Sequence, residues 1–338
     1  MKLNLFYNPI NKAKKYRENG LYEKLFKFTE KQITSDKLNN YDKGYLYYER
    51  GMGFFYTEDY QKSSDNFEGA LKFLSKTNTE EKEIIASIYY FMSLLQSQEK
   101  ERDKYTRKSF FMYKKLAKEH ENHEYYTYLG ELYFYLNCLE QSSKCFEKAL
   151  SLSKDKNDSS DILARLGYFE ILKQQYKEAK DYYLKALSEF NSLKNPSIPS
   201  IYLGLGKIEY ELGNKIEAEI YLLKALKARN HSPTLKFSTF FEGDLNHCLG
   251  ISAYDNNKIS VALSYFLKAE ECLDESYISY NNLRLYIGHC YLSLKEYTKS
   301  ERKYEEVLQS EHSTKEEKDK VRYSLNRLAI LRDRGNKL

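Results

Sequence analysis

The chain has 338 residues, of which 41 % are hydrophobic and 30 % are charged, so it can bury a core beneath a large polar surface, as a soluble protein does. No stretch approaches the roughly 18 consecutive apolar residues of a membrane span, and the start, MKLNLFYNPINKAKK, lacks the long apolar run of a secretory signal. The net charge of +5 resides in residues 1–35, where eight Lys and Arg oppose three Glu, and the neutral remainder argues against a surface that follows a nucleic-acid backbone throughout.

Residues 1–35 predict a degenerate pair of helices. Ala13, Tyr16, Gly20, Tyr22 and Leu25 have the spacing of a pattern that returns more clearly downstream. The same stretch holds a basic cluster, Lys12, Lys14, Lys15 and Arg17. This cluster either contacts nucleic acid or an acidic partner, or forms the solvated face of a terminal helix, which is the simpler interpretation.

From residue 36 onward one pattern repeats. A small residue on a first helix is followed by mostly apolar residues at offsets +3, +9, +16 and +19 and by Ala or Ser at +12. The small residues of the six clear copies are Gly51, Gly130, Gly167, Gly206, Gly250 and Gly288. These offsets place one apolar stripe on the first helix and another on a second helix, with small residues where the two backbones approach. Since one pair cannot bury both faces alone, each pair must stack on the next.

The intervals between the small residues indicate a further copy. They are 79, 37, 39, 44 and 38 residues, and the first interval is long enough for two copies. Residues 80–98 and 101–119 predict two amphipathic helices in this gap. The sequence does not fix how the repeat pattern aligns within them.

The pattern resembles the tetratricopeptide repeat (TPR). The segments that carry the resemblance are LGELYFYLNCLEQSSKCFEKAL, LGYFEILKQQYKEAKDYYLKAL and LGISAYDNNKISVALSYFLKAE. The first-helix Trp of the family is replaced by Tyr at Tyr47, Tyr126 or Tyr202, and the Pro that closes the second helix is mostly missing. The resemblance implies an all-α solenoid, a right-handed superhelix of antiparallel helix pairs.

Two interruptions predict the domain organisation. The longest break, at residues 191–200 with Pro196 and Pro199, indicates a longer loop and a soft joint. Near the end, Ser313 and Glu316 have the spacing of a capping box that opens a last helix. We therefore expect a degenerate helix pair at 1–35, a TPR array at 36–312 and a capping helix at 313–338.

The resemblance also implies a binding groove. In TPR proteins the first helices line the concave face, and positions −6, −3, +1 and +4 from the small residue point into it. A groove of Tyr, His, Asn and a few charged residues suits an extended or helical peptide. The candidate groove residues are Tyr48, Thr127, Glu131, Phe134, Tyr168, Lys207, Tyr210, His247, Tyr254, Asn282 and His289.

The remaining chemistry of the sequence favours neither catalysis nor metal binding. Five cysteines form no CxxC pair, which favours reduced core thiols in a cytoplasm over disulfides. His120 and His123 give an HxxH spacing, but surface histidines at a helix junction explain it more simply. No phosphate-binding loop or hydrolase motif is present in the sequence. We expect no enzyme activity, no metal and no cofactor.

The sequence therefore predicts a cytoplasmic, non-enzymatic scaffold or adaptor that binds a protein or peptide along the concave face. One alternative is a signal-peptide receptor that regulates transcription or a partner enzyme, because TPR arrays with periods near forty residues occur in Gram-positive pheromone regulators. The roughly 35 residues before the first clear repeat are too few for the effector domain of those regulators. A second alternative is a nucleic-acid-associated regulator that uses the basic N-terminus. A homodimer is compatible with the sequence, and a membrane partner is not expected.

Overall fold

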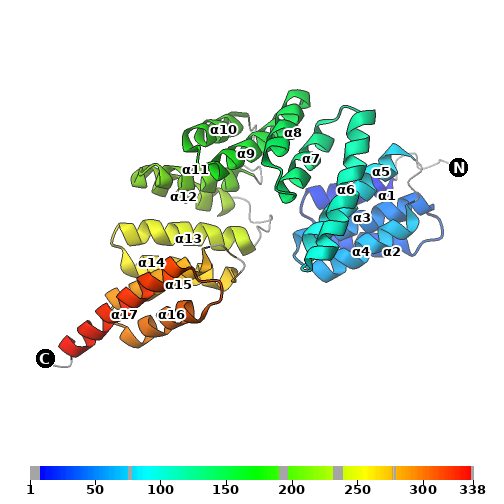
Figure 1. Cartoon of the computed structure of the whole chain (residues 1–338). Coiled ribbons are helices and arrows are strands. Elements are labelled where there is room, and N and C mark those ends of the chain that lie inside the picture. The colour runs from blue at the N-terminus through cyan, green and yellow to red at the C-terminus, as the bar shows by residue number, and fades with distance from the viewer. Residues whose placement is uncertain are drawn as a thin grey trace. The chain divides into compact units, whose positions relative to one another are not determined.

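The computed structural model describes residues 8–74, 78–189, 197–230, 239–275, 277 and 279–335, with side chains up to residue 332. These residues form seventeen α-helices and no strand (Figure 1). Sixteen of the helices make eight pairs and the last helix follows them, as the sequence predicts. None of the described helices combines the length and the apolar character needed to cross a membrane.

The first helices of the eight pairs are α1 (Pro9–Glu18), α3 (Asn40–Tyr56), α5 (Thr79–Leu95), α7 (His123–Tyr135), α9 (Lys156–Leu172), α11 (Ile198–Glu211), α13 (Thr239–Asp255) and α15 (Tyr280–Ser293). Their partners are α2 (Tyr22–Ile33), α4 (Tyr60–Phe73), α6 (Glu99–Glu119), α8 (Leu139–Leu152), α10 (Tyr176–Glu189), α12 (Lys215–Asn230), α14 (Ile259–Cys272) and α16 (Tyr297–Gln309). The final helix is α17 (Lys315–Gly335).

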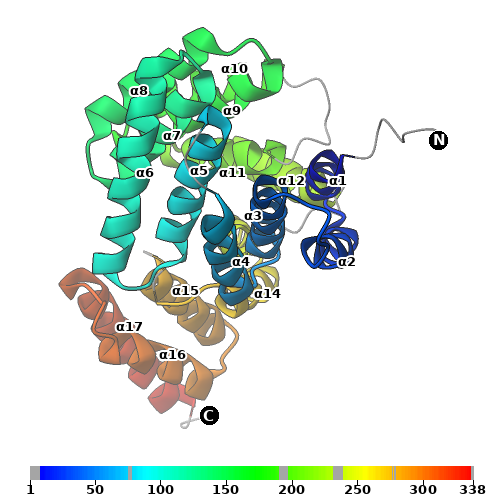
Figure 2. The same ribbon diagram turned by 90° about the vertical axis from the view of Figure 1, so that its right-hand side faces the viewer.

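The helices belong to two compact units, α1–α10 and α11–α17. Within each unit the second helix of one pair packs against the first helix of the next, as Figure 2 shows for α4 and α5. Pro199 lies in the first turn of α11, where a backbone without N–H leaves no helical hydrogen bond unmade. Residues 191–196 of the predicted joint lie outside the described residues, so the joint stays a prediction.

Each of the six clear copies is held together by a glycine that packs under a large side chain sixteen residues later. A Cβ at Gly250 would lie 2.5 Å from the ring of Phe266, and a Cβ at Gly288 would lie 2.5 Å from the ring of Tyr304. Both rings are fully buried. The same ring also contacts the next pair, since the Phe266 and Tyr286 ring centroids are 5.3 Å apart. One side chain therefore joins two helices of its own pair to the following pair.

A hydroxyl at the +12 position reinforces this contact. Ser63 and Ser300 are fully buried, and each donates a hydrogen bond of 2.9 Å to the carbonyl oxygen of the glycine twelve residues earlier, Gly51 or Gly288. A buried hydroxyl must find such an acceptor, because an unpaired one costs roughly 1–3 kcal/mol. The small residues at both positions let the two helices approach closely enough for this bond.

The turn inside a pair contains a left-handed residue seven positions after the small residue. The residues at this position have φ between 56° and 82°: Glu58, Asn137, Gln174, Gly213, Asn257 and Lys295. Gly20, with φ of 66°, lies seven residues after Ala13. The pair α1–α2 therefore has the same turn as the clear copies, in the register expected from the sequence.

The pair α5–α6 is longer than the others. Ser109 Oγ donates to the carbonyl oxygen of Ala86 at 2.8 Å, so Ala86 takes the place of the small residue and Ser109 that of the +12 residue. The two residues are 23 positions apart instead of twelve. Helix α5 continues four residues further than other first helices do, and α6 begins seven residues earlier than other second helices do, so both helices extend by whole turns.

Helix α17 packs against the last pair through its apolar stripe. Val321 and Leu328 are buried, and both belong to a core that includes Leu285 and Leu292 of α15. The capping box is one residue later than the sequence pattern indicates. Thr314, not Ser313, is paired with Glu317, because the Thr314 amide donates to Glu317 Oε2 at 2.8 Å and the Glu317 amide to Thr314 Oγ1 at 3.2 Å.

We expect Gly250→Ala to destabilise the second unit by about 1–3 kcal/mol, because the added methyl group overlaps the buried Phe266 ring. The measurement is urea unfolding followed by circular dichroism at 222 nm. Ser264→Ala, at an exposed position in α14 of the same pair, is the matched control and should not lower the unfolding midpoint. An unchanged midpoint for Gly250→Ala would mean that Phe266 does not fix the spacing of the pair.

Gln174→Gly should raise the free energy of unfolding by about 0.5–1 kcal/mol, because Gln174 adopts φ of 60°, which glycine tolerates without strain. Gly213→Ala at the equivalent turn should lower it by about 1 kcal/mol, since φ is 82° there and no atom lies near the new methyl group. Thermal melts of the two variants should therefore shift in opposite directions. Shifts of the same sign would contradict the conclusion that this turn position requires a positive φ.

Candidate functional site

The eleven candidate groove residues lie on the first helices of the pairs, on α3, α7 and α9 in the first unit and on α11, α13 and α15 in the second. We call the side of each unit formed by these positions its inner face. Consecutive first helices contact each other along it, as α3 does with α5, α11 with α13, and α13 with α15. Polar side chains cross these contacts and connect residues about 35–45 positions apart in the chain.

On the inner face of the first unit, several candidates bond to other helices. The Tyr48 hydroxyl lies 3.0 Å from Ser87 Oγ of α5. Glu131 accepts a hydrogen bond from the Tyr90 hydroxyl and forms an ion pair with Arg165, and only 12 % of its side chain is exposed. The Glu131 carboxylate is therefore satisfied within the protein and acts as a link from α5 through α7 to α9.

The other candidates of the first unit differ in accessibility. Thr127 donates its hydroxyl hydrogen to the carbonyl oxygen of His123, 2.9 Å away in its own helix. The rings of Phe134 and Tyr168 meet edge to face with centroids 6.2 Å apart, and 46 % of Tyr168 is exposed. Tyr168 therefore offers an open aromatic surface, whereas Thr127 is occupied by its own helix.

On the inner face of the second unit, Asp244 of α13 is the centre of a buried network. Lys207 Nζ lies 2.5 Å from Asp244 Oδ2, and the Tyr277 hydroxyl donates to Asp244 Oδ1 at 2.8 Å. His247 Nδ1 lies 3.1 Å from the same hydroxyl. Because the hydroxyl hydrogen points at Asp244, the hydroxyl oxygen accepts from His247, and His247 carries its proton on Nδ1. Asp244, His247 and Tyr277 are all buried.

This environment keeps His247 neutral. Burial lowers the pKa of His247 to about 4, and the Lys207 ammonium acts in the same direction against the opposing Asp244 carboxylate. Burial also raises the pKa of the adjacent Cys248 thiol to about 12, so that thiol stays protonated. With 3 % of its surface exposed, His247 is part of the internal network rather than of the open inner face.

Two of the other candidates of the second unit, Tyr254 and His289, line a cavity. The Tyr210 hydroxyl donates to Asp255 Oδ2 at 3.2 Å, and Asp255 also pairs with Lys215 at 2.8 Å. Tyr254 and His289 have ring centroids 6.4 Å apart. Both line a cavity of about 670 Å³ together with residues of α17. Asn282 is half-buried on α15 and does not line the cavity.

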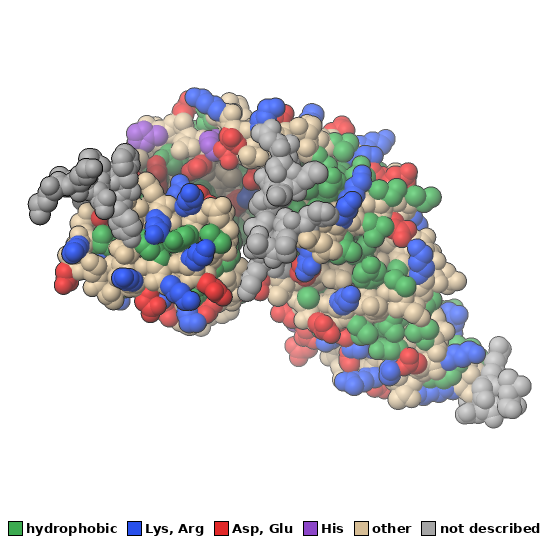
Figure 3. Space-filling model, turned by 180° about the vertical axis from the view of Figure 1, so that it is seen from behind, with side chains coloured by type: hydrophobic (Ala, Val, Ile, Leu, Met, Phe, Trp, Pro, Cys, Tyr) green, Lys and Arg blue, Asp and Glu red, His purple; other side chains and the backbone are tan. Residues whose placement is uncertain are grey.

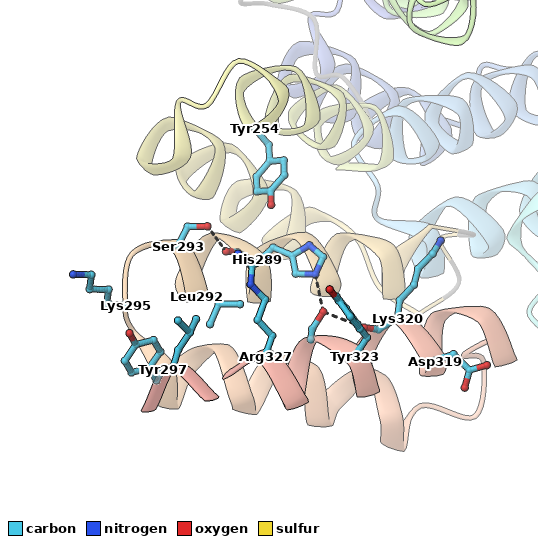
Figure 4. A pocket seen from close by; sticks show the side chains of 12 residues that line it. Tyr254, His289, Leu292, Ser293, Lys295, Tyr297, Asp319, Lys320, Tyr323 and Arg327 are labelled. Carbon is cyan, nitrogen blue, oxygen red and sulfur yellow. Dashed lines mark hydrogen bonds between the residues drawn. The ribbon is translucent and has the colours of Figure 1, made fainter. Parts of the chain in front are cut away.

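The cavity lies where α17 covers the inner face of α13 and α15 (Figure 4). Aromatic residues, apolar residues and cations line it: Tyr254, Tyr297, Tyr323, Leu292, Leu331, Lys295, Lys320 and Arg327, with His289, Ser293, Asp319 and Ser324. His289 Nε2 lies 3.1 Å from Ser324 Oγ, and this hydroxyl donates to the Lys320 carbonyl oxygen at 3.0 Å. Burial, with a smaller contribution from Arg327, lowers the pKa of His289 to about 4. We call this the α17 pocket.

Sequence reasoning missed the α17 side of this pocket. Lys320, Tyr323 and Arg327 follow one another at helical spacing beside the buried stripe of α17. An exposed Tyr with an Arg four residues later could have signalled a second functional face on that helix. Because the resemblance implies only a capping role for a final helix, these residues were not candidates.

The other sequence candidates are not assembled into a site. His120 is exposed, and His123 Nε2 lies 3.5 Å from Asp158 Oδ2. Among the described residues, no group of three or more His, Cys, Asp or Glu is arranged to hold a metal ion. All five cysteines are free thiols.

The basic N-terminal cluster is partly occupied by internal contacts. Arg17 Nε lies 2.6 Å from the fully buried Glu49 carboxylate, and Lys12 Nζ lies 5.0 Å from the Phe28 ring centroid. Over the face shown in Figure 3, side chains of both charges alternate with hydrophobic ones. These contacts leave Lys14 and Lys15 as the more exposed cations of the cluster, which gives little support to nucleic-acid binding through it.

A family model for the tetratricopeptide repeat matches residues 123–156, 160–190 and 199–231. These ranges coincide with the pairs α7–α8, α9–α10 and α11–α12. These three helix pairs are tetratricopeptide repeats. The same glycine, +12 residue and left-handed turn recur in α3–α4, α13–α14 and α15–α16, which confirms the expected TPR-like solenoid class.

Solved structures with the TPR fold resemble this chain at low sequence identity. PilF of Pseudomonas aeruginosa is 12 % identical with a TM-score of 0.55, and the match covers 70 % of this chain and 97 % of that one. Yeast Tom70 is 15 % identical with a TM-score of 0.54, covering 98 % of this chain and 67 % of that one. PilW, described as a type IV pilus biogenesis factor, is 19 % identical with a TM-score of 0.51, covering 68 % and 96 %. At these identities the likeness concerns the fold alone.

A curated relative matches part of the sequence. The human cilia- and flagella-associated protein 70 is 30 % identical over 103 residues, which are 30 % of this chain and 9 % of that protein. This chain therefore spans less than a tenth of the length of that relative. The aligned length corresponds to about three TPR helix pairs.

We expect the stability of the second unit to fall as the pH drops from about 6.5 toward 4. In the unfolded chain a histidine titrates near pH 6.5, but the folded pKa values of His247 and His289 are about 4. Between these values the unfolded chain binds more protons, so acid favours unfolding, and each histidine contributes about 1.4 kcal/mol per pH unit. Above pH 7 this contribution is constant.

Urea unfolding at a series of pH values between 4.5 and 7 measures this effect. His247→Gln and His289→Gln should each reduce the proton uptake on unfolding by about one, and the double variant by about two. The slope of the free energy of unfolding against pH is informative even when a variant is less stable at every pH. Slopes equal to that of the unmodified protein would show that neither histidine is held neutral by the fold.

Proposed function

We propose that this TPR protein is a non-enzymatic adaptor that binds a protein or peptide segment on the inner face of its second unit. The observation that carries the proposal is the α17 pocket, because it joins exposed aromatic surface to a cationic lining next to the predicted groove residues Tyr254 and His289. TPR arrays are suited to protein interaction, and the aromatic and cationic lining of this pocket supports the proposal.

The dimensions and lining of the pocket fit part of a peptide. A cavity of about 670 Å³ lies within the range of small-ligand sites, so it has room for a few side chains of a longer segment. Tyr323 is 73 % exposed, and its ring can cover an incoming apolar or backbone surface. The Tyr254 hydroxyl and the His289 ring can exchange hydrogen bonds with peptide amides.

The inner face of the first unit is less suited to the same role. Its central carboxylate, Glu131, is already bonded to Tyr90 and Arg165. Tyr168 and the neighbouring Tyr135, 46 % and 51 % exposed, still provide aromatic surface there. We therefore assign the peptide site to the second unit, because the inner face of the first unit offers aromatic surface but its central carboxylate is already bonded.

A cytoplasmic location agrees with the state of the cysteines. All five are free, and Cys145, Cys248 and Cys290 have thiol pKa values raised by burial, to about 11, 12 and 12. Such thiols are unreactive and suit a reducing compartment. This assignment is part of the proposal and rests on cysteine chemistry.

Filling the pocket tests the proposed function. Ser293 is an exposed residue of α15 that lines the pocket, so Ser293→Trp should place a large ring in it without disturbing the core. Ser264→Trp makes the same change at an exposed position of α14 outside the pocket. Affinity capture from the native host, read by mass spectrometry, should yield proteins or peptides that the unmodified protein and Ser264→Trp retain and that Ser293→Trp loses by about tenfold or more.

Equal capture by all three proteins would move the binding surface away from the pocket. Circular dichroism melts of both Trp variants show whether the comparison is between folded proteins. Loss of capture by Ser264→Trp as well would indicate that the outer side of the second unit participates, contrary to the proposal.

A further inference from the structure

Arg327 is set apart from the other arginines of the second unit. Five of the six arginines whose side chains the structure describes there form ion pairs within the unit: Arg229, Arg284, Arg302, Arg322 and Arg332. Arg327 forms no ion pair with any described residue. A charged group that stays unpaired in a protein with 49 Asp and Glu residues is available for an external anion.

The Arg327 side chain points into the α17 pocket. Figure 4 shows it extending from α17 toward His289 and Tyr254. Both neighbours are uncharged under ordinary conditions, because the His289 pKa is lowered to about 4 and the Tyr254 pKa is raised by burial. Among the described residues no carboxylate is paired with the Arg327 guanidinium, so its charge is directed into the pocket.

Two further cations stand at the ends of the pocket. Figure 4 shows Lys295 and Lys320 on opposite sides of Arg327. Lys320 pairs with Glu316 at 2.7 Å, but the two side chains are 58 % and 78 % exposed, so the pair is weak and easily exchanged. The single acidic residue of the lining, Asp319, points away from the pocket and accepts a 2.7 Å bond from Arg322. The pocket thus presents a row of three cations.

Apolar surface separates these cations. Leu292 and Leu331 lie on the two helices that enclose the pocket, and Tyr323 covers it from α17. A ligand that uses the whole pocket must therefore combine several negative charges with apolar side chains. A small inorganic anion would use the charges only and leave the apolar surface in water.

We propose that the α17 pocket binds an acidic peptide segment through the side-chain carboxylates of Asp or Glu, with Arg327 as the central anchor. This inference rests on the proposed function and adds the chemistry of the partner to it. The planar guanidinium can hold a carboxylate through two parallel hydrogen bonds, and the lysines at either end attract the acidic residues that flank it. Apolar residues of the segment pack on Leu292, Leu331 and Tyr323.

The row of cations favours side-chain carboxylates over a peptide C-terminus. A terminal carboxylate is a single charge and would neutralise one cation of the three. A segment with several acidic side chains meets all three and continues past the pocket in both directions. A free terminus is therefore the competing source of the carboxylate, and the experiment separates the two.

A positional-scanning library of hexapeptides with acetylated and amidated ends tests the proposal. In each member one position is fixed and the others are mixed, and binding of the labelled full-length protein is measured in 50 mM salt. Members with fixed Asp or Glu should bind about tenfold more protein than those with fixed Asn or Gln at one position or more, the factor expected of a charge-assisted contact. Salt at 300 mM should reduce this preference, because exposed charges are screened.

Arg327→Gln should abolish the preference for Asp and Glu while leaving the fold intact, because Arg327 is exposed and unpaired. Arg302→Gln removes an arginine of the same unit that is 81 % exposed and lies outside the pocket, so it should keep the preference. Arg327→Lys should retain part of it, since a lysine keeps the charge but loses the paired hydrogen bonds.

The outcomes distinguish the possibilities. No preference for Asp or Glu in the unmodified protein, or the same preference in Arg327→Gln, overturns the proposal. Stronger binding of a matched library with free C-termini and no acidic side chains would overturn it in favour of terminal carboxylate recognition. If Ser293→Trp loses its captured partner but the library shows no acidic preference, the proposed function stands and this inference falls.

Discussion

The contact between a glycine on one helix and a buried ring sixteen residues later determines the geometry of every pair that has it. The glycine allows the ring to lie against its backbone, and the ring in turn reaches the first helix of the next pair, as Phe266 reaches Tyr286. The spacing within a pair and the stacking between pairs are therefore set by the same side chain. Because this contact uses one side of the first helix, another side is left facing its counterparts in adjacent pairs, and there the inner face forms.

Most of the fold could be predicted from the sequence because this contact leaves a strict spacing of residue types. The exception was the register of α5–α6, whose two helices were predicted but whose small residue is Ala86, with the corresponding Ser109 23 positions away rather than twelve. Fixed offsets from a glycine cannot align the repeat pattern in a pair whose two helices have grown by different lengths. The capping box of α17 was displaced by one residue for a simpler reason, since Ser313 and Thr314 both precede an acidic residue by three positions.

The site was less predictable than the fold. The resemblance placed all eleven candidates on the first helices, but it could not show which of them are bonded to another helix. Glu131 pairs with Arg165 and Lys207 pairs with Asp244, each more than thirty residues away in the chain. These ion pairs depend on how the helix pairs stack rather than on the local sequence pattern. Arg327 was missed because it lies on a helix outside the repeat. Its significance comes from having no ion pair with any described residue, which a sequence does not reveal.

The longer α5–α6 pair has a consequence for how this protein can vary in length. Its extra residues, four in α5 and seven in α6, correspond to one and two turns, so both helices keep the same rotation about their axes. An added segment of two or five residues would turn the buried stripe toward water. Viable insertions and deletions in the helices of this array are consequently restricted to steps near whole turns, so evolution can lengthen a hairpin only in discrete increments.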